Sequence, residues 1–187
     1  AGNANIEGGV SWWFPLYLPA GTRISARGAG GRVNTTFGII PTIYGGQGLP
    51  PWRVGGKVTT YGMGTVPAGT TIVPGTSSAL GAFAQITATT SEDHFALVGS
   101  FQAGLDTTKA ATTYRTVIGL GAATEEQLNA DAKQVYGMTA AELYNSWGTH
   151  MVFYRDIPSG TRLAMAAAIN GGTLDAGNYN GVIHAMS

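Results

Sequence analysis

The chain has 187 residues, and its ten basic and ten acidic residues cancel to a net charge of zero. Charged residues make up 11% of the sequence, against about 25% in an average soluble domain. The apolar fraction of 44% excludes an intrinsically disordered tail, and the lack of a basic excess argues against nucleic acid as a partner. There is no cysteine, which excludes disulfides, thiolate metal sites and cysteine nucleophiles. Few charges and many small residues favour a secreted or cell-surface protein.

Residues 10–105 are predicted to be rich in β-structure, with short strands between turns. The predicted strands are Ser11–Tyr17, Arg23–Ala26, Val33–Ile40, Lys57–Tyr61, Thr71–Val73, Phe83–Thr89 and Phe95–Phe101. Glycine pairs and prolines separate them. No segment of this part has a helical period, so it is predicted to form a mainly antiparallel sheet.

One short phrase occurs three times, at residues 18–22, 66–70 and 157–161. Each copy has a hydrophobic residue, a proline, a small residue, a glycine and a threonine. Proline fixes its own φ and glycine accepts a positive φ, so each phrase is predicted to be a turn.

Two helices are predicted next, at about 125–136 and 140–147. Thr124 and Gln127 have the spacing of a capping box, and Thr139 and Glu142 repeat it. Apolar residues at helical spacing follow the first box: Leu128, Ala132, Val135 and Tyr136.

The chain then returns to strands, with His150–Tyr154 and Arg162–Ile169 predicted to pair as a β-hairpin within residues 149–170. The prediction is a single α+β domain over residues 1–187. It consists of a large, mainly antiparallel, bent and twisted sheet with the small helical pair at 124–147 inserted before the hairpin.

The sequence contains no recognisable catalytic or metal-binding pattern. The histidines, His94, His150 and His184, lack the spacing of metal ligands. The motifs that accompany serine nucleophiles are missing, and Glu126 and Glu142 are explained as residues of helix starts. We therefore expect a protein that is not an enzyme and that holds no cofactor and no metal.

Aromatic residues near the N-terminus form the candidate contact surface. Its members are Trp12, Trp13, Phe14, Tyr17 and Trp52. Large aromatic side chains serve equally well in a core and at a contact surface. The surface readings are a sugar-stacking platform, a membrane-interface belt or a contact between subunits.

A second cluster of residues lies where the predicted helical pair meets the following strand: Tyr144, Trp147, Gly148, Thr149 and His150. Their order resembles the signature of the membrane attack complex/perforin (MACPF) superfamily. The resemblance implies a bent antiparallel sheet flanked by helical clusters, in a fold like that of pore-forming toxins. On this reading the motif residues pin the junction between helix and strand and have no catalytic role.

The leading hypothesis is a secreted, non-enzymatic MACPF-like protein that acts by self-association, with membrane lipid as a candidate partner. The charges of Glu126, Asp131 and Lys133 argue against pore formation by this chain alone, because they interrupt the alternation that a membrane-spanning strand needs. One alternative is a self-assembling structural protein of a sheath, fibre or shell, since zero net charge reduces repulsion between copies. The other is a carbohydrate-binding module that uses Trp12, Trp13 or Trp52 to bind a glycan.

Overall fold

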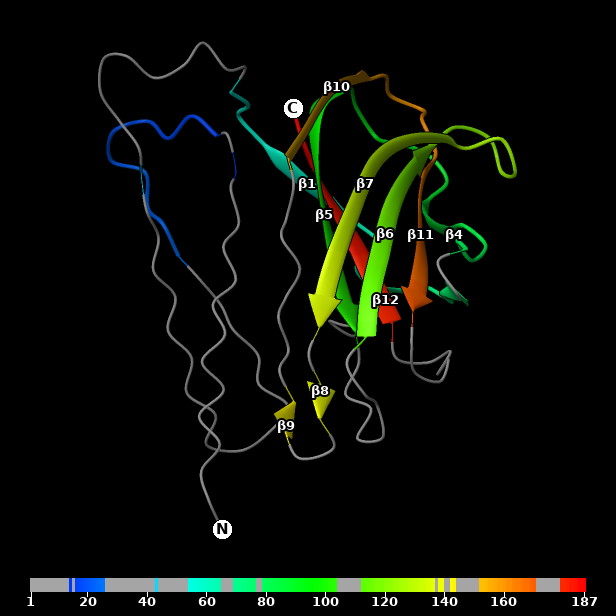
Figure 1. Cartoon of the computed structure of the whole chain (residues 1–187). Helices are drawn as coiled ribbons and strands as arrows, with labels where there is room; N and C mark the ends of the chain where they lie inside the picture. Colours follow the sequence, from blue (N-terminus) through cyan, green and yellow to red (C-terminus); the bar gives the residue numbers. More distant parts are fainter. Residues whose placement is uncertain are drawn as a thin grey trace.

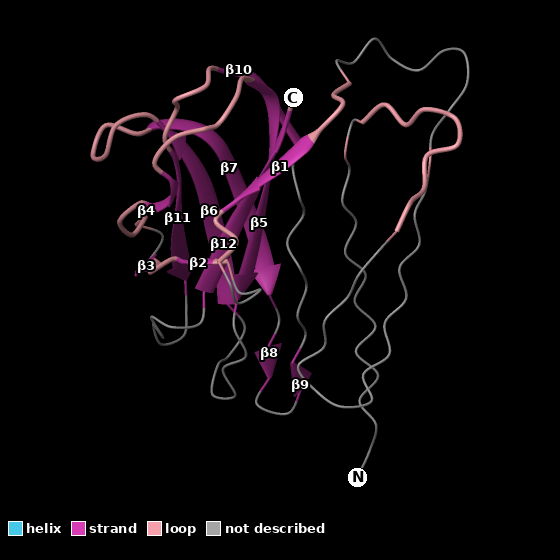
Figure 2. Ribbon diagram, turned by 180° about the vertical axis from the view of Figure 1, so that it is seen from behind, coloured by secondary structure: helices cyan, strands magenta, loops and turns pink. Residues whose placement is uncertain are grey.

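The computed structural model describes residues 14, 16–25, 43, 54–64, 69–76, 79–103, 112–136, 138–139, 142–143, 152–170 and 179–187. These residues form two five-stranded sheets and a separate two-stranded pair, and none of them is in a helix. The two larger sheets pack face to face, with β7 nearest the viewer in Figure 1 and β1 nearest in Figure 2. The described part of the chain is therefore a β-sandwich.

The first sheet has the strand order β1-β12-β5-β10, with β2 also paired to β12. Its strands are β1 (Val58–Tyr61), β2 (Thr70–Thr71), β5 (His94–Ala103), β10 (Val152–Ile157) and β12 (Tyr179–Met186). All its pairings are antiparallel. The longest runs from Tyr179 opposite Ala103 to Met186 opposite Ala96, so the last strand of the chain lies in the middle of this sheet.

The second sheet has the order β3-β11-β6-β7, with β4 also paired to β11. Its strands are β3 (Gly75–Thr76), β4 (Ala84–Thr87), β6 (Thr112–Leu120), β7 (Gln127–Tyr136) and β11 (Leu163–Asn170). The pairing of β3 with β11 is parallel and the others are antiparallel. The separate pair consists of β8 (Met138–Thr139) and β9 (Glu142–Leu143).

The main core lies between the two sheets. The first sheet contributes Leu97 and Ile183, and the second contributes Leu163 and Met165, each at most 2% exposed. Residues that alternate along a strand point to one face, which is why a sequence of short alternating segments closes into two layers around one core. A smaller cluster, made of Phe95, Ala96, Val98 and Met186, packs with Leu16 and Val58.

Several predicted strands are confirmed, with shifted ends. The predictions at Lys57–Tyr61, Phe83–Thr89, Phe95–Phe101, His150–Tyr154 and Arg162–Ile169 correspond to β1, β4, β5, β10 and β11. The prediction at Thr71–Val73 starts one residue late and ends two residues late, since β2 is Thr70–Thr71.

The outcome differs for the three strands predicted nearest the N-terminus. Residues 23–25 of the segment predicted at Arg23–Ala26 are not in a strand. In the segment predicted at Ser11–Tyr17, the described Leu16 makes a single parallel bridge to Gly55. The strand predicted at Val33–Ile40 lies outside the described residues.

The α+β prediction is wrong for the described residues, because the predicted helix at 125–136 is strand β7. It pairs with β6 from Leu120 opposite Gln127 to Thr112 opposite Tyr136. Alternation of apolar and polar residues from Ala130 to Lys133 is the signal for this strand. Alanine and lysine favour helices in isolation, but pairing with a neighbouring strand overrides that weak preference. Within the second predicted helix, 140–147, the described residues 142–143 form β9.

The predicted capping box at Thr124 is a turn between β6 and β7. Thr124 has a φ of +69°, which is the left-handed region and does not suit a residue that begins a helix. Glu126 does not cap a helix either, because its Oε1 accepts a hydrogen bond from Arg162 Nη1 at 2.8 Å. Burial pushes the pKa of Glu126 upward, but hydrogen bonds from Arg162 and from backbone N–H groups outweigh it and hold the pKa below its ordinary value.

The two arms predicted as a hairpin within residues 149–170 are strands of different sheets. Strand β10 pairs with β5 in the first sheet, and β11 pairs with β6 in the second. The turn at residues 158–161 therefore carries the chain from one layer to the other. The buried Thr90 fixes this turn: its hydroxyl donates to the Pro158 carbonyl oxygen at 2.9 Å and accepts from the Thr161 N–H at 3.1 Å.

The first and third copies of the repeated proline–glycine–threonine phrase form turns, as predicted, whereas residues 66–68 of the second copy lie outside the described residues. The N–H and hydroxyl of Thr22 both donate to the Pro19 carbonyl oxygen, at 3.1 and 2.6 Å, and Thr161 does the same to Pro158. The glycines of the three copies, Gly21, Gly69 and Gly160, have φ values of +82°, +81° and +83°. A positive φ is available to glycine at no steric cost, which explains the glycine of the phrase.

Candidate functional site

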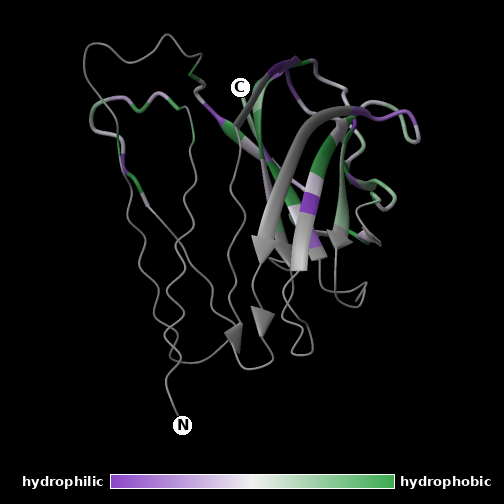
Figure 3. Cartoon of the chain, in the orientation of Figure 1, coloured by the Kyte–Doolittle hydropathy of each residue, from purple (hydrophilic) through white to green (hydrophobic). Residues whose placement is uncertain are grey.

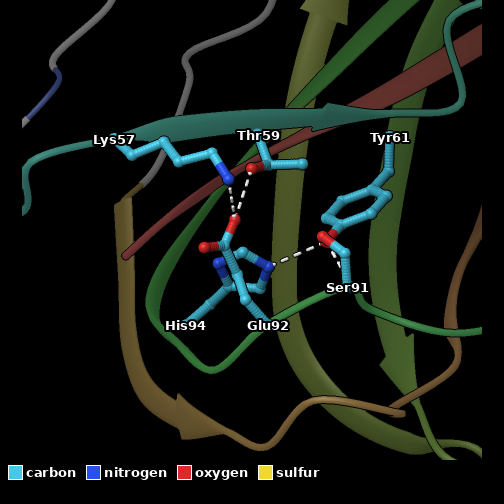
Figure 4. A network of polar contacts seen from close by, with 6 residues as sticks. All are labelled: Lys57, Thr59, Tyr61, Ser91, Glu92 and His94. Carbon is cyan, nitrogen blue, oxygen red and sulfur yellow. Dashed lines mark hydrogen bonds and ion pairs between the residues drawn. The ribbon is translucent and has the colours of Figure 1, made fainter.

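A network of polar side chains joins β1 to the segment that leads into β5. Lys57, Thr59 and Tyr61 alternate along the chain at β1, so they lie on the same side of it. All three reach the segment 91–94 (Figure 4). We call these three residues and Ser91, Glu92 and His94 the β1 clamp.

Glu92 is the anionic centre of the β1 clamp. Its Oε1 accepts hydrogen bonds from Lys57 Nζ at 2.6 Å and from Thr59 Oγ1 at 2.9 Å. The hydrogen bond from Lys57, followed by that from Thr59, lowers the pKa of Glu92 from its ordinary value. The Lys57 side chain is 61% exposed and that of Glu92 is 31% exposed, so water screens this ion pair and its contribution to stability is small.

Tyr61 is the neutral centre of the β1 clamp. Its hydroxyl lies 2.9 Å from His94 Nε2 and 3.1 Å from Ser91 Oγ, and it accepts a hydrogen bond from the Ser91 N–H at 3.0 Å. The rings of Tyr61 and His94 meet edge to face, with centroids 5.7 Å apart. The Tyr61 hydroxyl thus contacts three polar atoms that belong to two residues, Ser91 and His94.

His94 is 3% exposed, and its Nδ1 is buried without a hydrogen-bond partner among the described residues. Burial lowers the pKa of His94, and the nearby Glu92 carboxylate opposes that shift in part. Burial therefore favours the neutral imidazole at this position.

The contacts of the β1 clamp attach β1 to the segment that leads into β5. Nε2 of His94 is within hydrogen-bonding distance of the Tyr61 phenol, so the imidazole has a neutral partner of its own.

An open cavity of about 470 Å³ lies beside the clamp and is lined in part by Asp93, His94 and Asp156. One oxygen of Asp93 accepts a hydrogen bond from the Ser159 N–H at 2.7 Å. Across the described residues, no three His, Asp or Glu side chains are grouped to hold a metal ion.

We expect the free energy of unfolding to fall as the pH is lowered from about 6.5. His94 has a lowered pKa in the folded protein, so the unfolded chain binds its proton more readily. Its stabilising contribution is complete above the unfolded pKa and is lost as the pH falls toward the folded pKa. Glu92 and Glu126 also have lowered pKa values, and they add losses of the same sign at more acidic pH.

Urea denaturation of the wild type and of His94→Gln, at pH values between about 8 and 5.5, measures this effect. The variant should show a flatter pH dependence than the wild type. His184→Gln is the control, because His184 is only half-buried and its Nδ1 lies 2.8 Å from Thr60 Oγ1. Equal slopes for the wild type and the His94 variant would contradict the role given to His94.

Part of the predicted aromatic contact surface is described. The Phe14 ring, 36% exposed, meets His184 of β12 edge to face with centroids 5.7 Å apart. Tyr17 is 68% exposed, although its N–H donates to the Gly55 carbonyl oxygen at 2.9 Å. Phe14 is therefore partly packed against β12, whereas Tyr17 lies at the surface. Trp12, Trp13 and Trp52 lie outside the described residues.

The motif that resembles the MACPF signature also lies outside the described residues. This holds for all of its members: Tyr144, Trp147, Gly148, Thr149 and His150. Its predicted place at a junction between helix and strand stays a prediction.

Sequence reasoning missed the β1 clamp and the Glu126–Arg162 ion pair. The residues around Glu92 and His94 carry no local signal that shows which strand lies beside them. The available signal was the alternation of Lys57, Thr59 and Tyr61 on one face of a correctly predicted strand. This alternation marks a polar face but does not identify the partner segment, which lies 30 to 35 positions away in sequence.

Comparisons with protein-family models, curated proteins and solved structures found no match to this chain. Within the described residues, no helix has the length and apolar character needed to cross a membrane.

Proposed function

We propose that this protein is a non-enzymatic structural subunit that acts by associating with copies of itself. The observation that supports the proposal is the exposure of apolar side chains along residues 16–25, which we call the N-terminal arm. Tyr17, Leu18 and Ile24 of the arm are 68%, 40% and 47% exposed, and Val54, next to the arm's bridge at Gly55, is 55% exposed. Figure 3 shows apolar residues and a strongly polar one along this segment.

The arm has a fixed attachment to the sandwich, which favours a specific contact. Leu16 bridges Gly55 and packs against the smaller core cluster, so the start of the arm is anchored. Scattered exposed apolar residues are ordinary on a soluble protein, but a local group of them marks an interaction surface. With zero net charge, no long-range repulsion opposes contact between copies.

Self-assembly of a structural subunit replaces the MACPF-like reading as the favoured function. The resemblance implied helical clusters that flank the sheet, and the helical pair predicted at 125–136 and 140–147 suited that fold, but the described residues between 127 and 143 form β7, β8 and β9. The glycan-binding alternative depends on tryptophans outside the described residues. The exposed arm supports association between copies without either premise.

Light scattering coupled to size exclusion, over a range of concentrations, tests the proposal. We expect a mass above the 19.2 kDa of one chain that rises with concentration. The double variant Tyr17→Ser/Ile24→Ser should shift this rise to higher concentration, because it removes apolar surface that is buried on association. Met63→Ser is the matched control, since Met63 is also exposed, at 58%, and lies outside the arm.

A monomer at every concentration would refute the proposed function. Repeating the measurement with mixed-lipid liposomes separates the rival reading, because large, discrete oligomers that form on lipid alone would favour a membrane-directed protein. Equal effects of the arm variant and the Met63 control would refute the role of the arm.

A further inference from the structure

Strand β7 forms one edge of the second sheet. It is paired with β6 on one side, and among the described strands none is paired with it on the other (Figure 1). At ten residues it is a long edge strand. The open row of N–H and C=O groups on such an edge is a template for another strand.

Symmetry limits how two copies of β7 can pair. Antiparallel pairing of identical strands creates a two-fold axis perpendicular to the sheet, and each residue stays on its own face. Because neighbouring residues alternate between faces, residues opposite one another must be an even number of positions apart in sequence. The axis therefore passes through a residue position.

The regular part of β7 further limits the residue positions at which the two-fold axis can lie. The register against β6 shifts between Ala130 and Leu128, where the strand has a bulge. Residues 130–136 are the regular stretch that remains. An axis that keeps Ala130 within regular pairing and lies near the middle of β7 falls at Asp131, Ala132 or Lys133.

Charge then distinguishes the three positions. An axis at Asp131 sets two aspartates opposite one another, and an axis at Lys133 does the same with two lysines. An axis at Ala132 sets Asp131 of each copy opposite Lys133 of the other, so two opposite-charge pairs form. Opposite charges directly across an antiparallel pair stabilise it, and like charges destabilise it.

We propose that β7 pairs antiparallel with β7 of a second copy, about a two-fold axis at Ala132, so that one continuous sheet spans both copies. The contact is self-complementary, as a two-fold interface must be. This inference rests on the proposed function, because it names one surface through which the copies associate. The same two charges disfavour the neighbouring registers, which gives the edge a single preferred partner.

A disulfide cross-link tests the register. The chain has no cysteine, so Ala132→Cys introduces a single thiol. Directly opposed Cα atoms in antiparallel strands lie about 4.5–5.5 Å apart, within the range that a disulfide spans. Mild oxidation should therefore give a covalent dimer. Ala130→Cys is the control, since its two thiols would be four residues apart along the strands, about 13 Å.

Charge reversal tests the same register without oxidation. Asp131→Lys and Lys133→Asp each create two like-charge pairs, and each should weaken dimerisation by about tenfold or more. The double variant Asp131→Lys/Lys133→Asp restores both opposite-charge pairs and should return the dissociation constant to within about threefold of the wild type. Sedimentation equilibrium measures the constants. The recovery separates a lost contact from a lost fold.

The outcomes separate the two proposals. A wild type that stays monomeric overturns both. Self-association that persists unchanged in the charge variants, with no cross-link at position 132, overturns the β7 contact and leaves the proposed function standing. Equal cross-linking at positions 130 and 132 overturns the register at Ala132.

Discussion

Replacing Gly181 by alanine is expected to lower the free energy of unfolding by about 3 kcal/mol. Gly181 lies in β12, where the two sheets come close together. A Cβ atom there would meet Ile72 Cδ1 at 2.6 Å and Met165 Sδ at 2.8 Å. Ile72 and Met165 are 0% and 2% exposed, so neither side chain has free space into which to move. A close-packed interior resists one extra methyl group under these conditions.

A double-mutant cycle shows whether the contact with Met165 causes the loss. Met165→Ala alone leaves a cavity and should cost about 3 kcal/mol. In the double variant Gly181→Ala/Met165→Ala, the new methyl occupies part of that cavity, so the loss should fall short of the sum by at least about 1 kcal/mol. Urea denaturation measures all three variants.

Gly56→Ala is the control for the general effect of replacing a glycine. Nothing lies within 4 Å of the Cβ that it would add, and the expected change is below about 0.5 kcal/mol. Strict additivity in the cycle, or an equal loss at Gly56, would show that the contact between Gly181 and Met165 does not cause the loss.

Replacing Arg162 by methionine is expected to cost about 2 kcal/mol. Its guanidinium donates to Glu126 Oε1 at 2.8 Å, to Gln85 Oε1 at 3.0 Å and to the Gly121 carbonyl oxygen at 3.2 Å. The side chains of Arg162 and Glu126 are 14% and 6% exposed. Methionine preserves much of the apolar stem, so the main effect is a carboxylate left without its cation.

The same variant should change the pH dependence of stability. Arg162 helps to hold the pKa of Glu126 below its ordinary value, so its removal should raise that pKa. The loss relative to the wild type is then greatest at neutral pH and shrinks as Glu126 becomes protonated in acid. Adding Glu126→Gln removes the unpaired charge and should recover part of the stability at neutral pH.

Arg155→Met is the matched control for Arg162. Arg155 is exposed and its Nη2 donates to Gln127 Oε1 at 3.1 Å, so its replacement should cost less than about 0.5 kcal/mol. Equal losses at the two arginines, measured by urea denaturation, would contradict the importance given to the buried pair.

How far local sequence predicts this fold depends on the kind of interaction involved. The strand from Val58 to Tyr61 was predictable because its residues alternate and because turns flank it. The turns at Gly21 and Gly160 were predictable because a positive φ selects glycine. Both signals act within a few residues, where chain geometry alone decides the outcome.

The errors arose where a distant segment decides the structure. Residues 127–136 carry apolar spacing for a helix and an alternation for a strand, and both are present in the same ten residues. Pairing with β6 selects the strand. The strands predicted at His150–Tyr154 and Arg162–Ile169 correspond to β10 and β11 with shifted ends. Their places in two different sheets follow from β5 and β6, which lie far from them in sequence.

The sequence by itself determined the strand-rich character of residues 58–103, the proline–glycine turns, and a composition with little charge and no cysteine. These properties follow from backbone sterics and side-chain type, which each residue carries with it. The tertiary structure alone decided the two-layer packing, the partner of His94 and the pairing of Glu126 with Arg162. Those contacts join residues that are 33 and 36 positions apart, and their energies depend on burial that exists only once both sheets are in place.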